Sequence, residues 1–458
     1  MGFGLTLASL ITYHCRAFAA GNTGTKSLMN RIIATTGMAA VGALTLLPAG
    51  AQEAKPWNIN ATVRSFYDDN YTTLPSRAPA GLPTKRSTWG LELSPSGSYL
   101  LSRDQTSLTL NSRYSMRYFE DRTSGSADHS FDFGADLTHR FTEKQRFSLT
   151  DSFAIAQEPG VLDPSSAVST ALRTLGNNLR NNLQAKYAWD DIVERWSGEV
   201  SFSNTYYDFQ QDNTTAGGPG SRSALLDRVE NNFTLAGRYR IFDETETEML
   251  FGYTLGTSDS TSKDFLIGTV TPDSRNRLSH YFFSGLGHKF TPTLRVNGRL
   301  GVQYAEYSNA AKADAALALL GGAPYARSVA SPYVDANGTW EYLPNSTFQV
   351  GASVNRISTD VATSVDAQAT TFYTSLNHEF VPELRGSLMA QVQQSEYRQS
   401  VAPRDVSDLI LTVGTNLEWR FSQFWSVEGG YNYDRQDSDI GGRSYYRNRI
   451  YLGFRASF

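Results

Sequence analysis

The chain has 458 residues, of which 40% are hydrophobic, and it carries a formal net charge of −4 with a single cysteine. The acidic balance disfavours nucleic-acid binding. Beyond the N-terminal region there is no run of 18 apolar residues that could form a transmembrane helix. Aromatic residues make up 12% of the chain and glycines number 37, a composition that favours strands and turns over helices.

The N-terminal region has the pattern of an export signal. Met29-Asn30-Arg31 supplies a start and a positive charge, an apolar stretch follows over 32–47, and Ala49-Gly50-Ala51 fits a cleavage site. We therefore predict a signal peptide over 29–51, with residues 1–28 as an N-terminal extension from a wrongly assigned start codon. The alternative is a buried N-terminal helix. The mature chain, 52–458, would lack cysteine and therefore disulfides.

The last fifteen residues alternate between apolar and polar side chains up to the end of the chain. One face contains Tyr446, Ile450, Leu452, Phe454 and Phe458, and the other contains Arg447, Arg449, Tyr451, Gly453 and Arg455. This period of two predicts a strand with one face in lipid and one in water. The same alternation recurs over 106–119, 131–141, 294–304 and 409–421.

Connections of two lengths separate the predicted strands. Short turns include 94–97, 142–145, 243–245, 291–293, 344–346, 381–383 and 422–423, whereas long polar loops occupy 159–175, 210–226, 259–275 and 309–328. Short turns at one end and long loops at the other are typical of an outer-membrane barrel, with the short turns in the periplasm.

A large apolar residue precedes each short turn. The first is Leu93, and the other eight are aromatic. We expect these eight to form a periplasmic aromatic girdle at the membrane interface: Phe141, Trp189, Phe242, Phe290, Tyr342, Phe380, Phe421 and Phe458.

The predicted fold is all-β, a transmembrane antiparallel up-and-down β-barrel of 18 strands that encloses an aqueous lumen. Sixteen strands is the alternative count, because the N-terminal pair is the weakest part of the pattern. A soluble β-sandwich or β-helix competes with the barrel, but neither requires an aromatic residue at each turn.

Alternation also places a set of basic side chains on the lumen wall. A net basic wall within an acidic chain predicts a conduit for polar solutes, with a preference for anions as the finer hypothesis. The alternative is that acids on neighbouring strands neutralise these arginines. The predicted lumen-facing residues are Arg113, Arg117, Arg238, Arg240, Arg295, Arg299, Arg420, Arg447, Arg449 and Arg455.

The loop over 309–328 has an alanine-rich segment with helix propensity, which ends at Gly321-Gly322. Such a helix would either fold into the lumen as a constriction or lie at the rim.

The sequence offers no catalytic or cofactor-binding motif. The histidines beyond the signal, His129, His139, His280, His288 and His378, form no HExxH pattern or other metal-ligand spacing. GxSxG, P-loop and GxGxxG patterns are also missing. We therefore expect no enzyme activity, no cofactor and no metal.

Three aromatic-x-Pro turns, at 290–292, 342–344 and 380–382, and the ending 446–458 resemble the family described as Putative beta-barrel porin 2. The resemblance implies a location in the cell outer membrane of Gram-negative bacteria, in contact with lipid and lipopolysaccharide. Phe458 also resembles the terminal signal through which barrel-assembly machinery recognises its clients. Three functions remain open: a porin-like conduit for small polar solutes, the outer-membrane component of an exopolysaccharide export system, and a structural or adhesion barrel with a plugged lumen.

Overall fold

The computed structural model describes residues 55–75, 84–122, 126–156, 178–209, 220–403 and 405–458. The predicted signal peptide over 29–51 and the extension over 1–28 therefore lie outside the described residues, as do the loop 159–175 and residues 210–219 of the second long loop.

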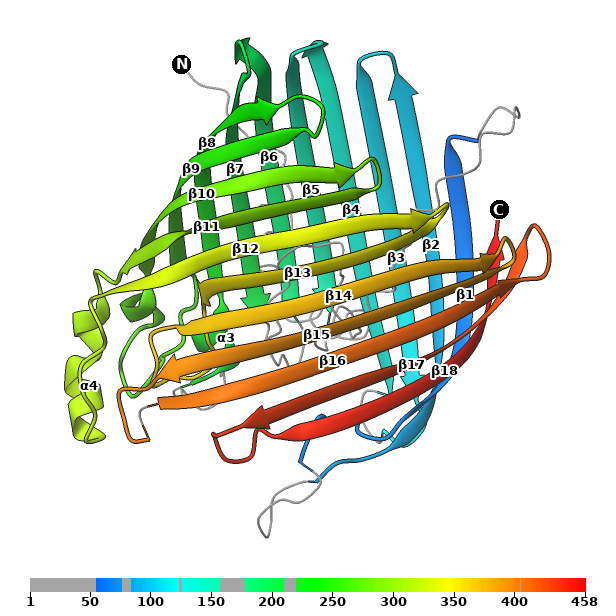
Figure 1. Ribbon diagram of the computed structural model, residues 1–458. Coiled ribbons are helices and arrows are strands. Elements are labelled where there is room, and N and C mark those ends of the chain that lie inside the picture. The colour runs from blue at the N-terminus through cyan, green and yellow to red at the C-terminus, as the bar shows by residue number, and fades with distance from the viewer. Residues whose placement is uncertain (1–54, 76–83, 123–125, 157–177, 210–219, 404) are drawn as a thin grey trace, which may run out of the picture.

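A single antiparallel sheet closes on itself (Figure 1). Each strand pairs with its neighbours in sequence, and β1 also pairs with β18, where Asn60 faces Ser457 and Asp68 faces Arg449. The count of 18 strands is confirmed, and the alternative of 16 is wrong. The strands are β1 (Trp57–Asp68), β2 (Thr88–Arg103), β3 (Thr106–Phe119), β4 (Ala127–Thr142), β5 (Gln145–Ala156), β6 (Asn178–Val193), β7 (Trp196–Phe209), β8 (Arg228–Phe242), β9 (Thr247–Ser260), β10 (Arg277–Thr291), β11 (Leu294–Glu306), β12 (Ser328–Leu343), β13 (Ser346–Ile357), β14 (Ala367–Val381), β15 (Leu384–Arg398), β16 (Asp405–Arg420), β17 (Trp425–Ser438) and β18 (Tyr445–Ser457).

The first predicted turn, 94–97 after Leu93, is wrong. These residues lie inside β2, and the turn to β3 comes at Asp104-Gln105. The composition Ser-Pro-Ser-Gly resembles a turn, but Pro95 faces Ala61 on β1, and the β2–β3 register is the same on both sides of it. The strand tolerates the proline with only a local gap in its pairing to β3.

Apolar side chains form the outer face of the barrel. On β18, Ile450, Leu452 and Phe454 are exposed, whereas Arg449, Tyr451 and Gly453 between them are buried on the inner side. Exposed apolar residues also lie along the outer face of β10 and β11. An apolar exterior around a polar interior is the arrangement that a lipid bilayer requires of a barrel.

Among the described residues, no helix is both long enough and apolar enough to span a membrane.

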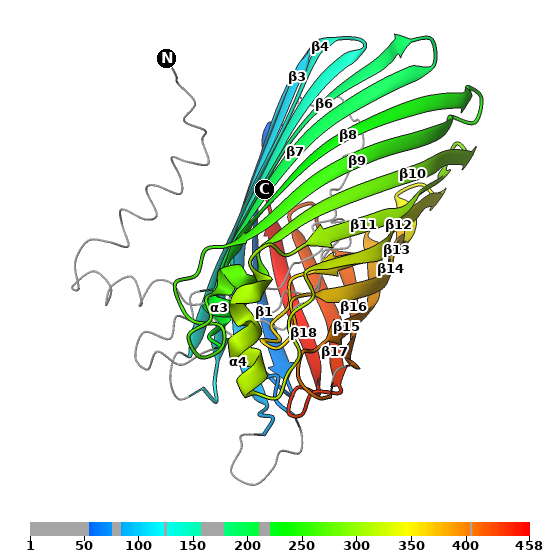
Figure 2. The ribbon, with the colours of Figure 1, turned by 90° about the vertical axis from the view of Figure 1, so that its left-hand side faces the viewer.

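Short helices lie at the loop end of the barrel: α3 (Arg222–Leu226), the 3-10 turn η1 (Pro272–Arg275), the 3-10 turn η2 (Ala310–Ala313) and α4 (Asp314–Leu319). Figure 2 shows α3 and α4 together at this end, away from the short turns. Ser221 caps α3 by accepting a hydrogen bond from the Ala224 amide at 3.0 Å.

The β13–β14 hairpin leaves the wall near its tip. Pairing of β13 with β12 stops at Val354, although β13 and β14 remain paired up to Ile357 and Ala367. The backbone amide of Arg356 instead donates to the inward-facing side chain of Gln303 on β11, at 3.0 Å. The hairpin tip, residues 358–366, therefore lies over the inner face of the barrel.

Candidate functional site

Arginines and carboxylates interlock on the inner wall where the barrel closes, in a region that we call the seam (β17, β18, β1, β2 and β3). Arg64 on β1 lies 3.3 Å from Glu92 on β2 and also bonds to Glu428 on β17. Arg64 reaches Glu428 across β18 because Gly453 stands between them: a Cβ at this glycine would lie 2.6 Å from the Arg64 side chain. Arg117 approaches the second oxygen of Glu92 at 3.3 Å.

The three predicted wall residues of β18 also belong to the seam. Arg447 and Arg449 share the carboxylate of Asp68, at 2.6 and 2.8 Å. Arg455 contacts Glu418 at 3.4 Å and Glu428 at 3.2 Å. Arg113, like Arg117, contacts Glu92, at 3.5 Å. The structure thus places half of the predicted basic wall, namely Arg113, Arg117, Arg447, Arg449 and Arg455, against acids of adjacent strands.

The other five predicted wall residues lie nearer the short turns. Arg238 pairs with Glu199 at 2.7 Å, and Arg240 and Arg295 form longer contacts with acids of the turns, at 3.6 to 3.8 Å. Arg299 and Arg420 are exposed and form no close ion pair within the described part of the chain, although Arg299 faces Asp335 across the β11–β12 pair and Arg420 lies within electrostatic range of Glu379. Net positive charge on this part of the wall therefore remains a prediction.

Contacts from several loops hold the hairpin tip in place. Arg275 of η1 donates to the carbonyl oxygens of Thr359 and Val365, at 2.5 and 3.1 Å. Arg443, in the β17–β18 loop, forms a two-point ion pair with Asp360, with both contacts at 2.9 Å. Five of the nine residues of the tip, Thr359 among them, are buried. The tip is therefore a packed element that narrows the loop end.

The alanine-rich helix predicted within 309–328 is present as η2 and α4. Leu317 is fully buried in a cluster with Tyr307 and Tyr325, whereas Leu319 is 89% exposed. Figures 1 and 2 place α4 at the outer edge of the loop end. Of the two predicted positions, the rim is the observed one, and the hairpin tip occupies the lumen instead.

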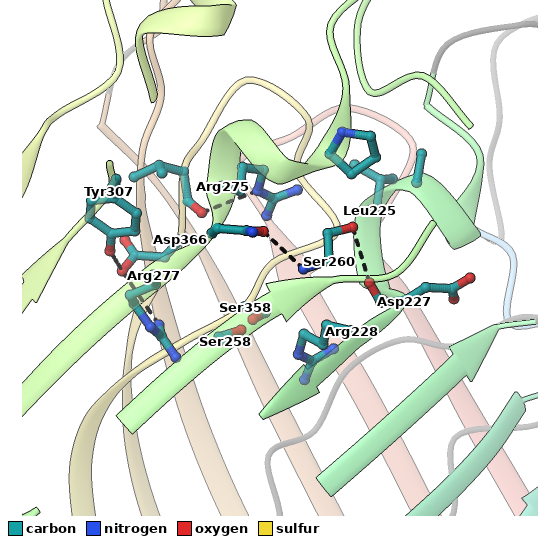
Figure 3. Close-up of a pocket in the computed structure, with 14 residues that line it drawn as sticks. Leu225, Asp227, Arg228, Ser258, Ser260, Arg275, Arg277, Tyr307, Ser358 and Asp366 are labelled. Atoms are coloured by element: carbon teal, nitrogen blue, oxygen red, sulfur yellow. Dashed lines mark hydrogen bonds and ion pairs between the residues drawn. The ribbon is translucent and has the colours of Figure 1, made fainter. Parts of the chain in front are cut away.

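A polar pocket lies between the hairpin tip and the wall formed by β8, β9 and β10 (Figure 3). Arg228 begins β8, Arg277 begins β10, and Ser258 lies near the end of β9, so these side chains meet at one level of the wall. Ser358 and Asp366 line the pocket from the tip. Such convergence of polar groups in a concavity marks a candidate binding site.

Two acids organise the pocket. Asp366 accepts hydrogen bonds from Tyr307 and Arg356, and Arg277 lies 3.8 Å from it. Glu230 pairs with Arg228 at 2.7 Å. Glu230 also hydrogen-bonds the Ser358 hydroxyl and attracts Arg277. Among the arginines that line the pocket, the buried donor without a partner in the described residues is Nη1 of Arg275.

Burial affects the ionisable groups at the rim of this pocket. It lowers the pKa of Arg275, against the opposing effects of Tyr325 and Asp366. It raises the pKa of the Tyr307 hydroxyl, and the neighbouring Asp366 carboxylate adds to the rise. For Arg443, burial opposes the charged form, but the carboxylates of Asp360 and Asp408 outweigh it and raise the pKa. The tyrosine hydroxyl therefore stays protonated, and Arg443 stays charged, near neutral pH.

Sequence alternation alone did not identify this pocket. Arg228 and Arg277 are the first residues of their strands, and Arg275 lies in a loop, where alternation assigns no face. The pocket also needs the inward bend of β13–β14, which no local pattern signals. The closely spaced Arg275 and Arg277 at a strand entrance are the one sequence feature that could have drawn attention to this region.

The eight predicted girdle residues lie near the ends of the even-numbered strands from β4 to β18, beside the short turns. Six are exposed on the outer face, whereas Trp189 and Tyr342 are partly buried. Phe141, Phe290 and Phe380 each pack edge-on against a histidine two positions earlier, with ring centroids 4.3 to 4.7 Å apart. Their role as a periplasmic girdle remains a prediction.

The described residues contain no cluster of histidine, cysteine, aspartate and glutamate that could hold a metal. Four of the five histidines hydrogen-bond instead to threonine or tyrosine on an adjacent strand, as His129 does with Tyr114 at 2.6 Å. His378 on β14 bonds to Tyr342 on β12, two strands away, at 2.8 Å.

Comparison with protein families confirms the resemblance for the C-terminal part of the chain. Residues 323–458 match the family model described as Putative beta-barrel porin 2. A search of curated protein sequences gives no match.

Solved structures similar to the chain include three proteins of Pseudomonas. A BenF-like porin from Pseudomonas fluorescens Pf-5 shares 12% identity at a TM-score of 0.44, over 89% of this chain and 100% of that one. The outer membrane protein OpdK from Pseudomonas aeruginosa shares 10% identity at 0.43, over 88% and 99%. OccK2 (OpdF) from Pseudomonas aeruginosa, solved with glucuronate, shares 12% identity at 0.41, over 88% and 98%.

Proposed function

We propose that this porin-like outer-membrane β-barrel conducts small polar solutes through its lumen and prefers anions. The observation that carries the proposal is the contrast between the two faces of one closed sheet. Apolar residues such as Leu452 face outwards, while charged and hydroxyl side chains line the interior. A closed sheet of 18 strands is wide enough to enclose an aqueous lumen.

The preference for anions rests on the arginines of the wall that are held less closely by carboxylates than those of the seam. The seam arginines are paired, so they contribute little field to the lumen. Arg299 and Arg420 at the turn end, and the arginines beside the hairpin tip at the loop end, supply the remaining positive charge. Fixed positive charge along a narrow path raises the local concentration of anions.

The reversal potential of refolded full-length protein tests this function. With a KCl gradient across a planar bilayer, we expect discrete conductance steps. We also expect the reversal potential to have the sign of the chloride equilibrium potential. A reversal potential on the potassium side would overturn the preference for anions. Absence of any conductance, from protein shown to be folded and inserted, would overturn the conduit itself.

A barrel with a plugged lumen is the second candidate, and one observation favours it. The hairpin tip receives contacts from η1, from the β17–β18 loop and from Tyr325, which donates to the Ala362 carbonyl oxygen. An element anchored from several sides could close the loop end. The same conductance measurement separates the two candidates, since a plugged barrel inserts without conducting.

Export through a signal peptide over 29–51 and insertion by barrel-assembly machinery through β18 are part of the proposal. Mass spectrometry of the protein purified from outer membranes would locate the mature N-terminus, which we expect at Gln52. A mature chain that retained residues 29–51 would contradict cleavage.

A further inference from the structure

Two tyrosines, one arginine and one aspartate gather in the middle of the wall that β10 to β14 form (Figure 1). Arg299 lies on β11, Tyr333 and Asp335 lie on β12, and Tyr373 lies on β14. Leu300 beside Arg299 is exposed on the outer face, so alternation and register direct all four side chains into the lumen. We call these four residues the mid-wall platform.

The two charges of the mid-wall platform face each other without closing an ion pair. Arg299 and Asp335 are direct cross-strand partners in the register of β11 and β12. Arg299 is exposed, engages the Tyr333 hydroxyl, and has its guanidinium carbon 5.7 Å from the centroid of the Phe283 ring. Within the described residues, the Asp335 carboxylate accepts no hydrogen bond and has no close ion pair. A free acceptor therefore lies opposite a charged donor.

The two tyrosine rings flank Asp335, which lies within electrostatic range of both hydroxyl groups. The Tyr373 ring covers Gly351 on β13, since a Cβ added to this glycine would lie 2.3 Å from the ring. A ring that covers a glycine of the neighbouring strand lies along the wall, so its other face is turned towards the lumen. Two aromatic rings of β10 hold the Tyr333 ring from the opposite side, with centroids 5.5 and 6.0 Å away.

This arrangement selects a solute by its charge. An anion held by Arg299 is repelled by Asp335, and a cation meets the reverse. A neutral molecule with adjacent hydroxyl groups satisfies both residues, because a hydroxyl donates to the carboxylate and accepts from the guanidinium. The nearest inner-facing neighbours in the register are also uncharged: Asn337, Ser353, Thr371 and Gln391.

The exposed ring face adds a second requirement. An aromatic face binds apolar surface, whereas polar groups beside it fix the orientation of a ligand. A pyranose sugar has both features, because its ring presents C–H groups on its faces and hydroxyl groups around its edge. A sugar ring that lies on Tyr373 brings its edge hydroxyl groups towards Asp335 and Arg299.

We propose that the mid-wall platform binds one neutral pyranose sugar, which stacks on Tyr373 and hydrogen-bonds to Asp335 and Arg299. The inference rests on the proposed function for the aqueous route by which the sugar reaches the wall. It goes beyond that function because it assigns a saturable site and a class of solute that a preference for anions does not supply.

The test measures binding rather than conduction. Full-length protein is refolded in micelles of a detergent without a sugar headgroup, and saturation-transfer difference NMR follows transfer from protein aromatic protons to the ligand. The ligands are methyl glucopyranoside, glucuronate and protonated glucosamine, which share one ring shape and differ in charge. We expect saturable transfer to the C–H protons of the neutral sugar, with severalfold weaker binding of both charged sugars. Equal or tighter binding of either charged sugar, or no saturable transfer to the neutral sugar, would overturn the assignment.

A charge variant tests the role of the aspartate. Asp335→Asn removes a charged acceptor, so we expect it to weaken binding of the methyl glucopyranoside about tenfold. The same variant removes the repulsion of anions, so binding of glucuronate should become tighter, a gain that a misfolded protein would not show. If both affinities stayed unchanged, or fell equally, the charge argument would be wrong.

Ring variants test the stacking. Tyr373→Leu should weaken binding of the neutral sugar severalfold, whereas Tyr373→Phe keeps the ring and should bind within about twofold of the native protein. Tyr253→Leu, on the outer face of β9 beside the exposed Phe282, is the matched control and should leave binding unchanged. No loss in Tyr373→Leu, or an equal loss in Tyr253→Leu, would contradict the site. Binding without bilayer conductance would refute the conduit alone, and conductance without binding would refute the mid-wall platform alone.

Discussion

The seam and the pocket beneath the hairpin tip are both rich in arginine, yet they differ in how carboxylates are shared. In the seam, Asp68 is fully buried and holds two arginines at 2.6 and 2.8 Å. In the pocket, Asp366 holds Arg356 closely but leaves Arg277 at 3.8 Å. Both regions hold buried polar atoms without a hydrogen-bond partner among the described residues, such as Nη2 of Arg113 in the seam and Nη1 of Arg275 beside the pocket. They differ because Asp68 of the seam holds both of its arginines at hydrogen-bonding distance and so fixes the contact between the first and last strands.

This difference shows that the number of arginines on a wall does not measure the charge that a solute meets. A buried ion pair stabilises only when its hydrogen bonds are complete, and removal of one partner is strongly destabilising. The seam arginines should therefore matter for stability and little for selectivity. The arginines of the pocket and of the turn end should matter for selectivity and little for stability.

The largest effect is expected from Asp68→Ala, which leaves Arg447 and Arg449 buried without their shared carboxylate. We expect a loss of about 3–5 kcal/mol in the free energy of unfolding, measured by denaturant titration in lipid vesicles. The matched control is Asp437→Ala, whose partner Arg435 is half exposed, and it should cost under about 1 kcal/mol. An equal loss in both variants would remove the distinction between buried and exposed pairs.

Gly453→Ala should have the next largest effect. The added Cβ would lie 2.6 Å from the Arg64 side chain and 2.7 Å from the Val63 carbonyl oxygen, so Arg64 would be displaced from Glu428. We expect a loss of about 1–3 kcal/mol in the same denaturant titration. Gly441→Ala, where a Cβ meets nothing within 4 Å, is the control. If Gly453→Ala left the free energy of unfolding unchanged, Arg64 would not need the space beside Gly453 to reach Glu428 across β18.

Selectivity is expected to respond to turn-end arginines. Replacing both Arg299 and Arg420 with glutamine removes two exposed positive charges from the lumen, so the reversal potential in a KCl gradient should move towards the potassium side. Arg435→Gln, on the outer parity of β17, should leave it unchanged. If the reversal potential of the double variant did not shift, the preference for anions would have to come from other residues.

The smallest effect is expected for the stability of Arg277→Gln. Arg277 lies 3.8 Å from Asp366, which keeps Arg356 as a closer partner, so its removal should lower the free energy of unfolding by only about 1 kcal/mol. A loss comparable to that of Asp68→Ala would mean that the pocket is a structural network like the seam.

Much of the fold was predictable from local patterns. Alternation in β18, β11 and β16 assigned their faces correctly, because a period of two is set by the strand itself. The turn misplaced at Leu93 shows where composition misleads, since pairing with β1 overrides the turn propensity of Pro95.

The sites depended on contacts that the sequence does not display. Arg64 and Glu428 are 364 positions apart in the chain and meet only after closure. Likewise, Arg275 contacts Thr359 because β13–β14 bends inwards, a tertiary feature without a local signature. Alternation predicted that Arg447 and Arg449 face inwards, but it could not show that Asp68 neutralises them.

Single-channel conductance tests most directly the central claim that the lumen is an aqueous path narrowed by the hairpin tip. The measurement compares full-length protein with a variant in which a Gly-Asn-Gly linker replaces residues 360–364, and with Leu319→Gln in the rim helix as control. We predict small conductance steps for the native protein and the control, and steps at least about twofold larger for the shortened tip, because conductance rises as a constriction widens. Equal conductance in all three, or none in any, would contradict the claim.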